Sequence, residues 1–405
     1  MDNAVETPAG RTPPAEPPFV EFTGRRGPLF KLVLKNILLN VVTLGIFRFW
    51  AKTRVRRYFW SNIVIGGEPL EYTGRGLELL IGFLIVLVVL VPLSLLQSGL
   101  DLLLQSGSFI LAGAFNVVYL AVFLYLIQFA LFRMWRYRLT RTQWRGIRFG
   151  LDGSAFRYAG RAFLWMIAQM ATLGVVTPWA NVDLMRYKVR KVHFGDTQFG
   201  LEGRGRDLLK PWLITMGIPL VIGIAGVAGM IVAPVARSST AIWPLPQFSA
   251  WGLLIPLAGF LFWGLWFWYR VQEFRYLVGC VRFGGAEFHS EAQLRKMLPA
   301  LLLAVALFFV MWLVIGGAMV MVVYATRGGG GLTPAAAFVP FLLIFVFVIL
   351  SPLVIYPVIM FSIIRHIWTT LSVSDSAAFD AAAQAPERAP KFGEGLADAF
   401  DVGAF

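Results

Sequence analysis

The chain has 405 residues, of which 58% are hydrophobic and only 14% are charged, with a net charge of +14. A soluble domain is roughly one quarter charged, so this composition excludes an ordinary soluble protein and favours an integral membrane protein. The single cysteine, Cys280, excludes an intrachain disulfide and a cysteine-based metal site.

The two ends of the chain differ in composition from the rest. Residues 1–18 are rich in proline and lack the apolar core of a secretory signal peptide. Residues 372–405 are rich in alanine, aspartate and glycine. Neither segment can bury enough apolar surface to fold, so we expect a disordered tail at each end.

Residues 19–148 are predicted to form a first repeat. An aromatic stretch with a glycine opens it, and an apolar segment ending at Thr43-Leu44-Gly45 follows. A basic stretch and a β-hairpin with a Gly66-Gly67 turn come next. Residues 79–100 and 102–132 then lack Asp, Glu, Lys and Arg. About 20 apolar residues suffice for a helix to span a bilayer, so each run is predicted to be one span.

Residues 149–272 are predicted to form a second repeat of the same kind. The sequence TLGIFRFWAKTRVRRY at 43–58 returns as TLGVVTPWANVDLMRY at 172–187, an offset of 129 residues. This match indicates a duplication, with a second hairpin after it and two further uncharged runs at 211–236 and 238–269.

Residues 273–371 are predicted to form a third, shorter repeat. It keeps a hairpin, VRFGGAEFHS, and spans within 297–326 and 328–364, but it has no segment of the TLG type. The predicted fold is therefore an all-α polytopic membrane protein. Six transmembrane helices form three parallel two-helix repeats, and short cytoplasmic β-hairpins accompany them.

Basic residues are crowded on one side of the predicted spans. Of 36 Lys and Arg residues, only Arg237 and Arg327 lie in the short stretches 97–106, 233–248 and 325–335, which join the two spans of each pair. Basic loops stay in the cytoplasm, so we predict that both termini and all hairpins are cytoplasmic.

The two TLG segments are predicted not to cross the membrane. If residues 162–182 crossed, a basic stretch would lie outside, and Lys31 and Lys35 make the first segment amphipathic. We expect re-entrant or interfacial helices that begin and end on the cytoplasmic side.

Two interpretations of the TLG segments stay open. The helices form an amphipathic collar at the headgroups, or they line a cleft like the broken helices of transporters. The neutral polar, glycine and tryptophan positions shared by both segments are the candidate cleft residues: Asn40, Thr43, Gly45, Trp50, Gln169, Thr172, Gly174 and Trp179.

Arginines alternate with aromatic residues next to the spans. This pattern is typical of interface anchoring, and it also suits anionic lipid headgroups. The candidate headgroup contacts are Arg54, Arg57, Tyr58, Arg136, Tyr137, Arg186, Tyr187, Arg275 and Tyr276.

The chain resembles a known family, most specifically in its first repeat. A Phe-x-Gly opening, the TLGIFRFWAKTRVRRY stretch and the IGGEPLEYTG hairpin resemble the YjgN-like bacterial inner-membrane proteins, a family of unknown function, over about residues 19–371. The second copy departs from the pattern with Thr177-Pro178 in place of Arg48-Phe49. The resemblance implies a bacterial inner membrane and no known activity, cofactor or catalytic residue.

The sequence contains no recognisable catalytic motif, and its three histidines lie far apart. We therefore expect neither an enzyme nor a bound metal or cofactor. The leading hypothesis is a transporter or channel-like protein for a small or amphipathic solute. The alternative is a structural or envelope-associated protein whose basic cytoplasmic face binds anionic lipid headgroups or partner proteins. Membrane lipids, anionic ones among them, are the expected partners; nucleic acid is not. The sequence indicates no oligomeric state.

Overall fold

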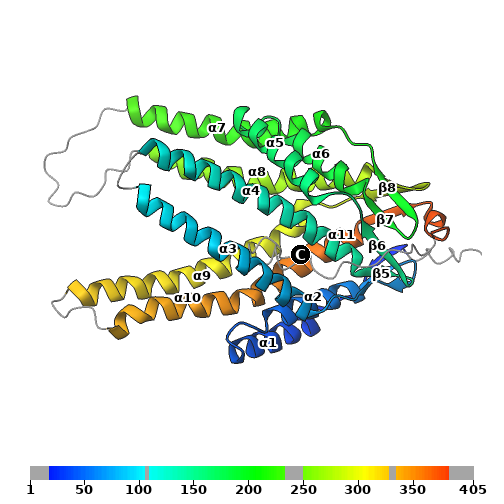
Figure 1. Ribbon diagram of the computed structural model, residues 1–405, viewed down its shortest axis with the longest axis horizontal. Helices are drawn as coiled ribbons and strands as arrows, with labels where there is room; N and C mark the ends of the chain where they lie inside the picture. The colour runs from blue at the N-terminus through cyan, green and yellow to red at the C-terminus, as the bar shows by residue number, and fades with distance from the viewer. Residues whose placement is uncertain (1–17, 105–108, 233–249, 328–333, 383–405) are drawn as a thin grey trace, which may run out of the picture.

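The computed structural model describes residues 18–104, 109–232, 250–327 and 334–382. The segment predicted as an N-terminal tail lies outside these residues, except for residue 18. A bundle of long helices lies at one end of the molecule and a β-sheet at the other (Figure 1).

Six helices of the described residues are long and apolar enough to span a membrane, as the sequence predicts. They are α3 (Gly76–Leu104), α4 (Phe109–Thr140), α7 (Leu209–Val232), α8 (Leu254–Gly279), α9 (Leu294–Arg327) and α10 (Pro334–Val354). Short 3-10 turns, η1 (Gly205–Leu208) and η2 (Ala250–Leu253), precede α7 and α8. α10 continues through a π-helical turn (Ile355–Met360) into α11 (Phe361–Thr369). The two spans of each pair, α3 with α4, α7 with α8 and α9 with α10, pack against each other (Figure 1).

Each TLG segment reverses direction at its Thr-Leu-Gly sequence, which forms the turn of a helical hairpin that we call a TLG hairpin. The first hairpin consists of α1 (Arg26–Val42) and α2 (Arg48–Ser61), and the second of α5 (Ala155–Ala171) and α6 (Thr177–Val189). The strands that flank each hairpin are hydrogen-bonded to each other, β1 to β2 and β6 to β7. Both ends of each TLG hairpin therefore lie in the sheet, at the same end of the molecule.

The β-strands form antiparallel sheets in which the β-hairpins pair with one another. Their bounds are β1 (Val20–Phe22), β2 (Ile63–Ile65), β3 (Glu68–Pro69), β4 (Glu71–Tyr72), β5 (Thr142–Trp144), β6 (Ile147–Leu151), β7 (Val192–Phe194), β8 (Thr197–Leu201), β9 (Val281–Phe283), β10 (Ala286–Ser290) and β11 (Leu371–Ser374). One sheet has the order β11-β10-β9-β8-β7-β6-β5-β4, and a second has the order β1-β2-β3. Only Leu70 separates β3 from β4, and β1 also approaches β11, so the strands curl round a common core.

Aromatic side chains from the hairpin turns fill this core. Trp144, Phe194 and Phe283, each the last residue of its strand, are at most 1% exposed. Phe379 lies among them, with its ring centroid 4.5 Å from that of Phe283 and 5.6 Å from that of Trp144. Trp144 Nε1 donates to the Ile65 carbonyl at 3.1 Å, which satisfies the indole within the core.

The structure corrects three expectations about the fold. The label all-α is wrong, because the hairpins pair with one another into an extended sheet, and one of them, Thr142–Leu151, was not predicted. The C-terminal tail does not begin at residue 372, since β11 and buried Phe379 belong to the sheet domain. The repeat boundaries at residues 148 and 272 fall inside β6 and inside α8.

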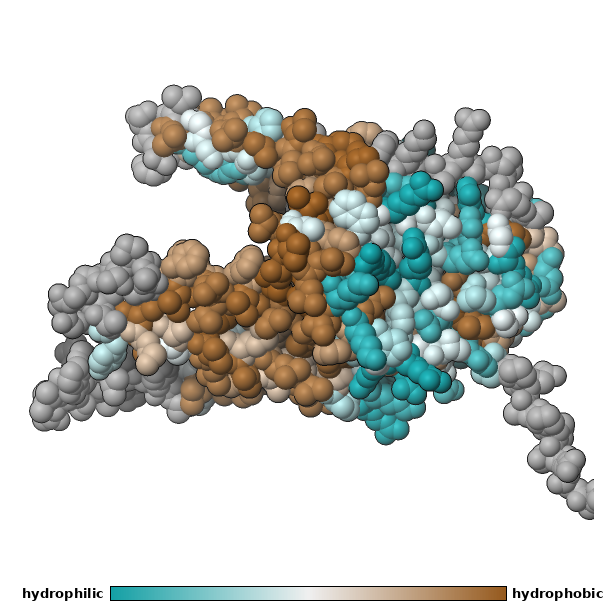
Figure 2. Space-filling model, turned by 90° about the horizontal axis from the view of Figure 1, so that it is seen from below, coloured by the Kyte–Doolittle hydropathy of each residue, from teal (hydrophilic) through white to brown (hydrophobic). Residues whose placement is uncertain are grey.

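The spans expose most of their apolar surface. Figure 2 shows hydrophobic residues over the helical end and hydrophilic residues over the sheet end. In the same view a notch divides the helical end into two arms. Inside a bilayer such side chains contact lipid, which a single transmembrane helix tolerates because its backbone hydrogen bonds are internal.

Candidate functional site

The two TLG turns have the same backbone geometry. Leu44 and Leu173 have φ values of 49° and 50°, and the following glycines, Gly45 and Gly174, have values of 91° and 84°. The amide of Gly45 donates to the Asn40 carbonyl at 2.8 Å, and that of Gly174 donates to the Gln169 carbonyl at 2.7 Å. Glycine adopts this left-handed conformation freely, whereas leucine is strained in it.

The tips of both hairpins present apolar side chains. Leu44 is 91% exposed and Leu173 is 89% exposed, although both are bulky and apolar. Val42 and Met170 beside them are also more than 70% exposed. An exposed leucine at the end of a helical hairpin is unfavourable in water and favourable among lipid acyl chains, so these tips are expected to lie in a bilayer.

The structure separates the two sets of predicted cleft residues. The α1–α2 hairpin lies against α10 and α3, whereas the α5–α6 hairpin lies against α4, on the opposite side of the bundle (Figure 1). The expectation of one shared polar cleft is therefore wrong. It failed because equivalent positions in two copies need not face each other when each copy packs on different spans.

Several of the predicted residues have structural contacts. Thr43 and Thr172 donate through their hydroxyls to backbone carbonyls four residues earlier, at 2.8 and 2.7 Å. Thr43 Oγ1 also accepts from the amide of Phe47 at 3.0 Å, which stabilises the first TLG turn. Trp50 packs against Gly76, and Trp179 packs in the same way against Gly205.

An open pocket lies beside the first TLG hairpin, and we call it the hairpin cavity. It has a volume of about 640 Å³ and lies between the TLG turn, α3 and α10. Its walls are mainly apolar, and its polar residues are Asn40 and Arg48. A smaller space of about 160 Å³, which reaches Asn36 and Tyr356, adjoins it at the same two residues.

Asn40 and Arg48 have unused hydrogen-bonding capacity. The Oδ1 atom of Asn40 is buried and accepts no hydrogen bond from any described residue. The Arg48 guanidinium lies over the rings of Phe49 and Phe83, 4.8 and 4.6 Å from their centroids. No carboxylate of the described chain pairs with it. A buried acceptor without a donor costs about 1–3 kcal/mol, so a ligand that supplies a donor would be favoured here.

Most of the predicted headgroup contacts are engaged within the protein. Arg57 donates to the Gly74 carbonyl at 3.4 Å, and Arg136 and Arg186 donate to the carbonyls of Gly153 and Gly203. In each case an arginine before a hairpin binds the glycine that follows it, 17 residues on. These arginines thus tie a helix to the end of the next hairpin.

The tyrosines that follow two of these arginines donate hydrogen bonds to residues earlier in the chain. Tyr58 and Tyr187 each donate to the carbonyl of a residue 33 positions earlier, Arg25 and Ser154, at 2.5 and 3.1 Å. Tyr276 accepts from the Arg204 amide at 2.6 Å. Two further residues of the set differ: Arg54 donates to Asn36 Oδ1 at 3.4 Å, and Arg275 is exposed.

Two carboxylates, each near the start of a span, accept hydrogen bonds from tyrosines of the same set and from an arginine, contacts that were not predicted from the sequence. Glu78 accepts hydrogen bonds from Tyr137 and from Arg141, the latter at 2.8 Å. Asp207 accepts from Tyr276 at 2.5 Å. Since Glu78 and Asp207 are 129 residues apart, the offset of the duplication could have identified them.

A charged cluster lies between α6 and α8. Glu273 is only 2% exposed; it accepts from Asn181 at 2.6 Å and from Arg270. Lys188 lies nearby with its Nζ atom 4.9 Å from the centroid of Trp135. Burial, and then the Arg270 guanidinium, lower the pKa of Lys188 to about 8.

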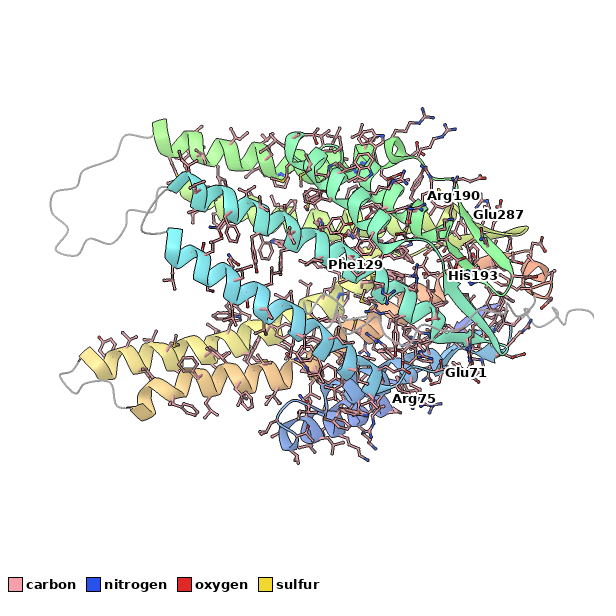
Figure 3. The ribbon with its side chains drawn as sticks, viewed as in Figure 1. Glu71, Arg75, Phe129, Arg190, His193 and Glu287 are labelled. Atoms are coloured by element: carbon pink, nitrogen blue, oxygen red, sulfur yellow. The ribbon has the colours of Figure 1, made fainter. Side chains whose placement is uncertain are left out.

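Charged residues otherwise gather at the sheet end. Figure 3 shows Glu71, Arg75, Arg190 and Glu287 at this end, whereas Phe129 lies among the spans. Within the described residues, no group of three His, Cys, Asp or Glu side chains is placed to hold a metal ion.

Comparisons with known proteins identify relatives in bacteria. The model of a family described as "Bacterial protein of unknown function (DUF898)" matches residues 17–301 and 239–389. "Inner membrane protein YjgN" of Salmonella typhimurium (strain LT2) is 31% identical over 156 residues, which are 38% of this chain and 36% of the relative. "Inner membrane protein YjgN" of Escherichia coli (strain K12) is 36% identical over 50 residues, 12% of each chain. The aligned part thus spans 36% of the Salmonella relative and 12% of the Escherichia coli relative, and no solved structure matches.

Proposed function

We propose that this chain, which belongs to the DUF898 family of bacterial proteins and is similar to inner-membrane proteins, binds an amphipathic anion from the membrane in its hairpin cavity. One observation carries the proposal. The same mainly apolar cavity is lined by Asn40, whose Oδ1 atom accepts no hydrogen bond, and by Arg48, which has no carboxylate partner among the described residues. The proposal is one of binding without chemical change of the bound molecule, so it assigns no enzymatic activity to the cavity.

The size of the cavity suits a small amphipathic molecule or part of a lipid. Ligand cavities are commonly about 300–1,000 Å³, with apolar walls and a few polar groups that orient the ligand. The hairpin cavity, at about 640 Å³, falls within this range. Leu80, Phe83 and Phe345 would contact the apolar part of the ligand, and Arg48 would bind its anionic group.

The choice of an anion follows from Arg48. A guanidinium held on two aromatic faces keeps its N–H groups available at the ring edges and suits carboxylate or phosphate. The second TLG hairpin has Thr177 at the equivalent position, so the proposal assigns this site to the first hairpin only. Asn40 would accept a hydrogen bond from a hydroxyl or amine of the same ligand.

The orientation we propose places the sheet and both termini in the cytoplasm. The basic residues support this, because they are concentrated at the sheet end of the pairs of spans. Both TLG hairpins would then be re-entrant and dip into the inner leaflet, with Leu44 and Leu173 contacting acyl chains. The equal turn geometries support an arrangement of three parallel two-helix repeats, of which the third lacks a TLG hairpin.

Transport of the bound anion stays a prediction of this proposal. The alternative, a structural protein that only contacts headgroups at its basic face, does not explain the orphan acceptor of Asn40. Flux of a fluorescent anionic amphiphile across vesicles that contain the protein would support transport. Binding without flux would leave the binding function and reject the transport function.

The experiment compares two matched substitutions, Asn40→Leu and Gln169→Leu. The protein is purified from vesicles of phosphatidylcholine with phosphatidylglycerol, and the phosphatidylglycerol retained per molecule is counted by native mass spectrometry. Asn40→Leu and Arg48→Gln should each remove one of the retained phosphatidylglycerol molecules. For Arg48→Gln the affinity of that site should fall about tenfold, since a hydrogen bond to a charged group contributes about 1.5–3 kcal/mol. Gln169→Leu should leave retention unchanged.

Thermal unfolding of the same samples separates binding from packing. The variants should unfold within a few degrees of the unmodified protein. If Asn40→Leu lowers stability and leaves retention per folded molecule unchanged, Asn40 serves helix packing, and the proposed function is wrong.

A further inference from the structure

A second pocket lies on the other TLG hairpin, between α5, α6 and the start of α7. It has a volume of about 380 Å³, and we call it the α6–α7 pocket. Its lining consists of two tryptophans, three arginines, an aspartate and two small or apolar residues: Trp165, Trp179, Arg186, Arg204, Arg206, Asp183, Val182 and Gly205. It shares no residue with the hairpin cavity.

The one carboxylate of the lining, Asp183, is already compensated. Its Oδ2 atom accepts from Arg161 Nε at 2.6 Å and from Trp165 Nε1 at 2.7 Å. Arg206 Nε forms a long, largely exposed ion pair with Asp207 Oδ1 at 3.8 Å, and Asp207 also accepts a hydrogen bond from Tyr276. The Arg204 side chain is exposed and pairs with no carboxylate of the described chain.

The backbone beneath these arginines is fixed. The amide of Arg204 donates to the Tyr276 hydroxyl at 2.6 Å, and this hydroxyl donates its proton to Asp207 Oδ2 at 2.5 Å. Gly205 is packed so tightly that a Cβ there would lie 2.6 Å from Trp179 Cα. The pocket therefore presents its guanidinium groups from a preorganised turn, which lowers the entropic cost of binding an anion.

A shallow, open apolar groove continues from the pocket along one face of α7. Arg206 lines both, and the groove, of about 550 Å³, is otherwise lined by Leu209, Lys210, Leu213, Ile214, Gly217 and Ile218. Leu213 and Ile218 are 47% and 45% exposed and lie on a helix that is long and apolar enough to span the membrane. The cationic pocket opens onto the apolar groove at the start of a membrane helix. Together they are complementary to a phospholipid, with the pocket matching the phosphate and the groove matching an acyl chain.

We propose that the α6–α7 pocket binds the phosphate of an anionic phospholipid, and that one acyl chain lies along the groove on α7. Arg204 and Arg206 bind the phosphate, Trp179 forms the wall at headgroup level, and Lys210 adds charge at the edge. The first hairpin has Leu77 and Ile81 at the positions equivalent to Arg206 and Lys210, so this site belongs to the second hairpin alone. The inference does not depend on the proposed function of the hairpin cavity.

The test uses the double variant Arg204→Gln/Arg206→Gln in the full chain. Its matched control is Arg295→Gln/Lys296→Gln, which removes the same charge from exposed positions at the start of α9. Binding of each protein in detergent micelles to spin-labelled phosphatidylglycerol is measured against phosphatidylcholine. The pocket variant should lose one of the phosphatidylglycerol sites, or bind there about tenfold more weakly, and the control should not change.

Free phosphate is the other source of the same chemistry. Glycerol 3-phosphate at the concentration of the lipid should not compete, because it cannot use the groove. Competition by glycerol 3-phosphate, or an equal loss in the control, would overturn the lipid assignment. Binding of phosphatidylglycerol by the pocket variant with unchanged affinity would do the same.

A second variant tests the groove without removing charge. A Cβ on Gly217 meets no atom within 4 Å, so Gly217→Phe should fold and obstruct the groove, whereas Gly316→Phe, equally open, lies on α9. Only Gly217→Phe should weaken phosphatidylglycerol binding. Equal binding by both variants would contradict a chain in the groove. Loss in the hairpin-cavity variant Arg48→Gln alone would assign all binding to the other site.

Discussion

Gly76 lies against Trp50 so closely that a Cβ on Gly76 would stand 2.7 Å from Trp50 Cγ and 2.9 Å from Trp50 Cα. Gly205 has the same relation to Trp179, with distances of 2.8 and 2.6 Å to the corresponding atoms. In both cases the second helix of a TLG hairpin packs directly onto the first residues after a β-hairpin. These two contacts hold each TLG hairpin against the head of a span.

Substitution of either glycine by alanine should destabilise the protein. Because the close atoms include the tryptophan backbone, rotation of the side chain cannot relieve the clash, and overpacking of this kind costs about 1–3 kcal/mol. Gly76→Ala and Gly205→Ala should therefore lower the unfolding temperature in detergent, measured by tryptophan fluorescence. Gly113→Ala on α4 is the control, since its Cβ meets nothing within 4 Å. Equal unfolding temperatures for Gly76→Ala and the control would show that the contact is not restrictive.

Phe379 should be essential for the stability of the sheet. Its ring stacks on Phe283 and contacts Trp144 and Phe194, so Phe379→Ala leaves a cavity in the aromatic core. Such truncations cost about 3–5 kcal/mol. Hydrogen exchange in β9 and β10 should accelerate strongly. Phe309→Ala, which removes a ring that is 61% exposed on α9, should leave that exchange unchanged.

Lys188 should make the protein more stable as the pH rises above 8. Its pKa falls from 10.5 to about 8 in the folded state, so between these values the unfolded chain binds a proton that the folded protein does not. Stability therefore rises through this window by an amount of about 1–3 kcal/mol. Lys188→Met, which keeps the apolar stem over Trp135, should be more stable at pH 7 and should lose most of the rise. A rise of the same size in the variant would assign it to other groups.

The spans could be predicted from the sequence because a charge inside a bilayer is costly, so a transmembrane helix appears as a long run without charged residues. The reversal at Gly45 and Gly174 was also predictable, since glycine marks a left-handed turn. The continuity of the sheet was not. Phe149 pairs with Phe194, and Phe199 pairs with Phe283, across intervals that contain whole helices, so no local pattern specifies these partners.

The candidate site was predicted only in part. Asn40 and Gly45 were among the predicted residues and do line the hairpin cavity, but Gln169 and Gly174 line none of the cavities described above. Arg48 was recognised as a difference between the copies and was not considered as a ligand. Its role depends on Phe83 and on α10, whose approach to the first hairpin is a tertiary contact.

Arg136 should act as a structural clasp and not as a lipid contact. It donates to the carbonyl of Leu151 at 2.8 Å and also to that of Gly153, a forked arrangement that lysine cannot reproduce. Arg136→Lys should lower the free energy of unfolding by about 1–2 kcal/mol and leave the phosphatidylglycerol retained per folded molecule unchanged. Arg275→Lys, at an exposed position, is the control for stability. Reduced retention with unchanged stability would restore the headgroup interpretation of Arg136.

The arrangement of the strands allows a direct test of orientation. All the hairpins lie at one end of the spans, so a single membrane topology puts every hairpin on the same side (Figure 1). In a variant with Cys280→Ala as the only background change, single cysteines at Gln198 and Glu287 report on exposed positions of the sheet. Cysteines at Ser106, Ser239 and Gly330 report on the stretches between the spans of each pair. Because basic residues are concentrated around the sheet, we expect an impermeant thiol reagent to label only the second group in intact cells and both groups after permeabilisation. Labelling of Gln198→Cys in intact cells would reverse the proposed orientation. Labelling of Gln198→Cys but not Glu287→Cys would contradict the shared sheet itself, because these two strands, β8 and β10, are joined through β9.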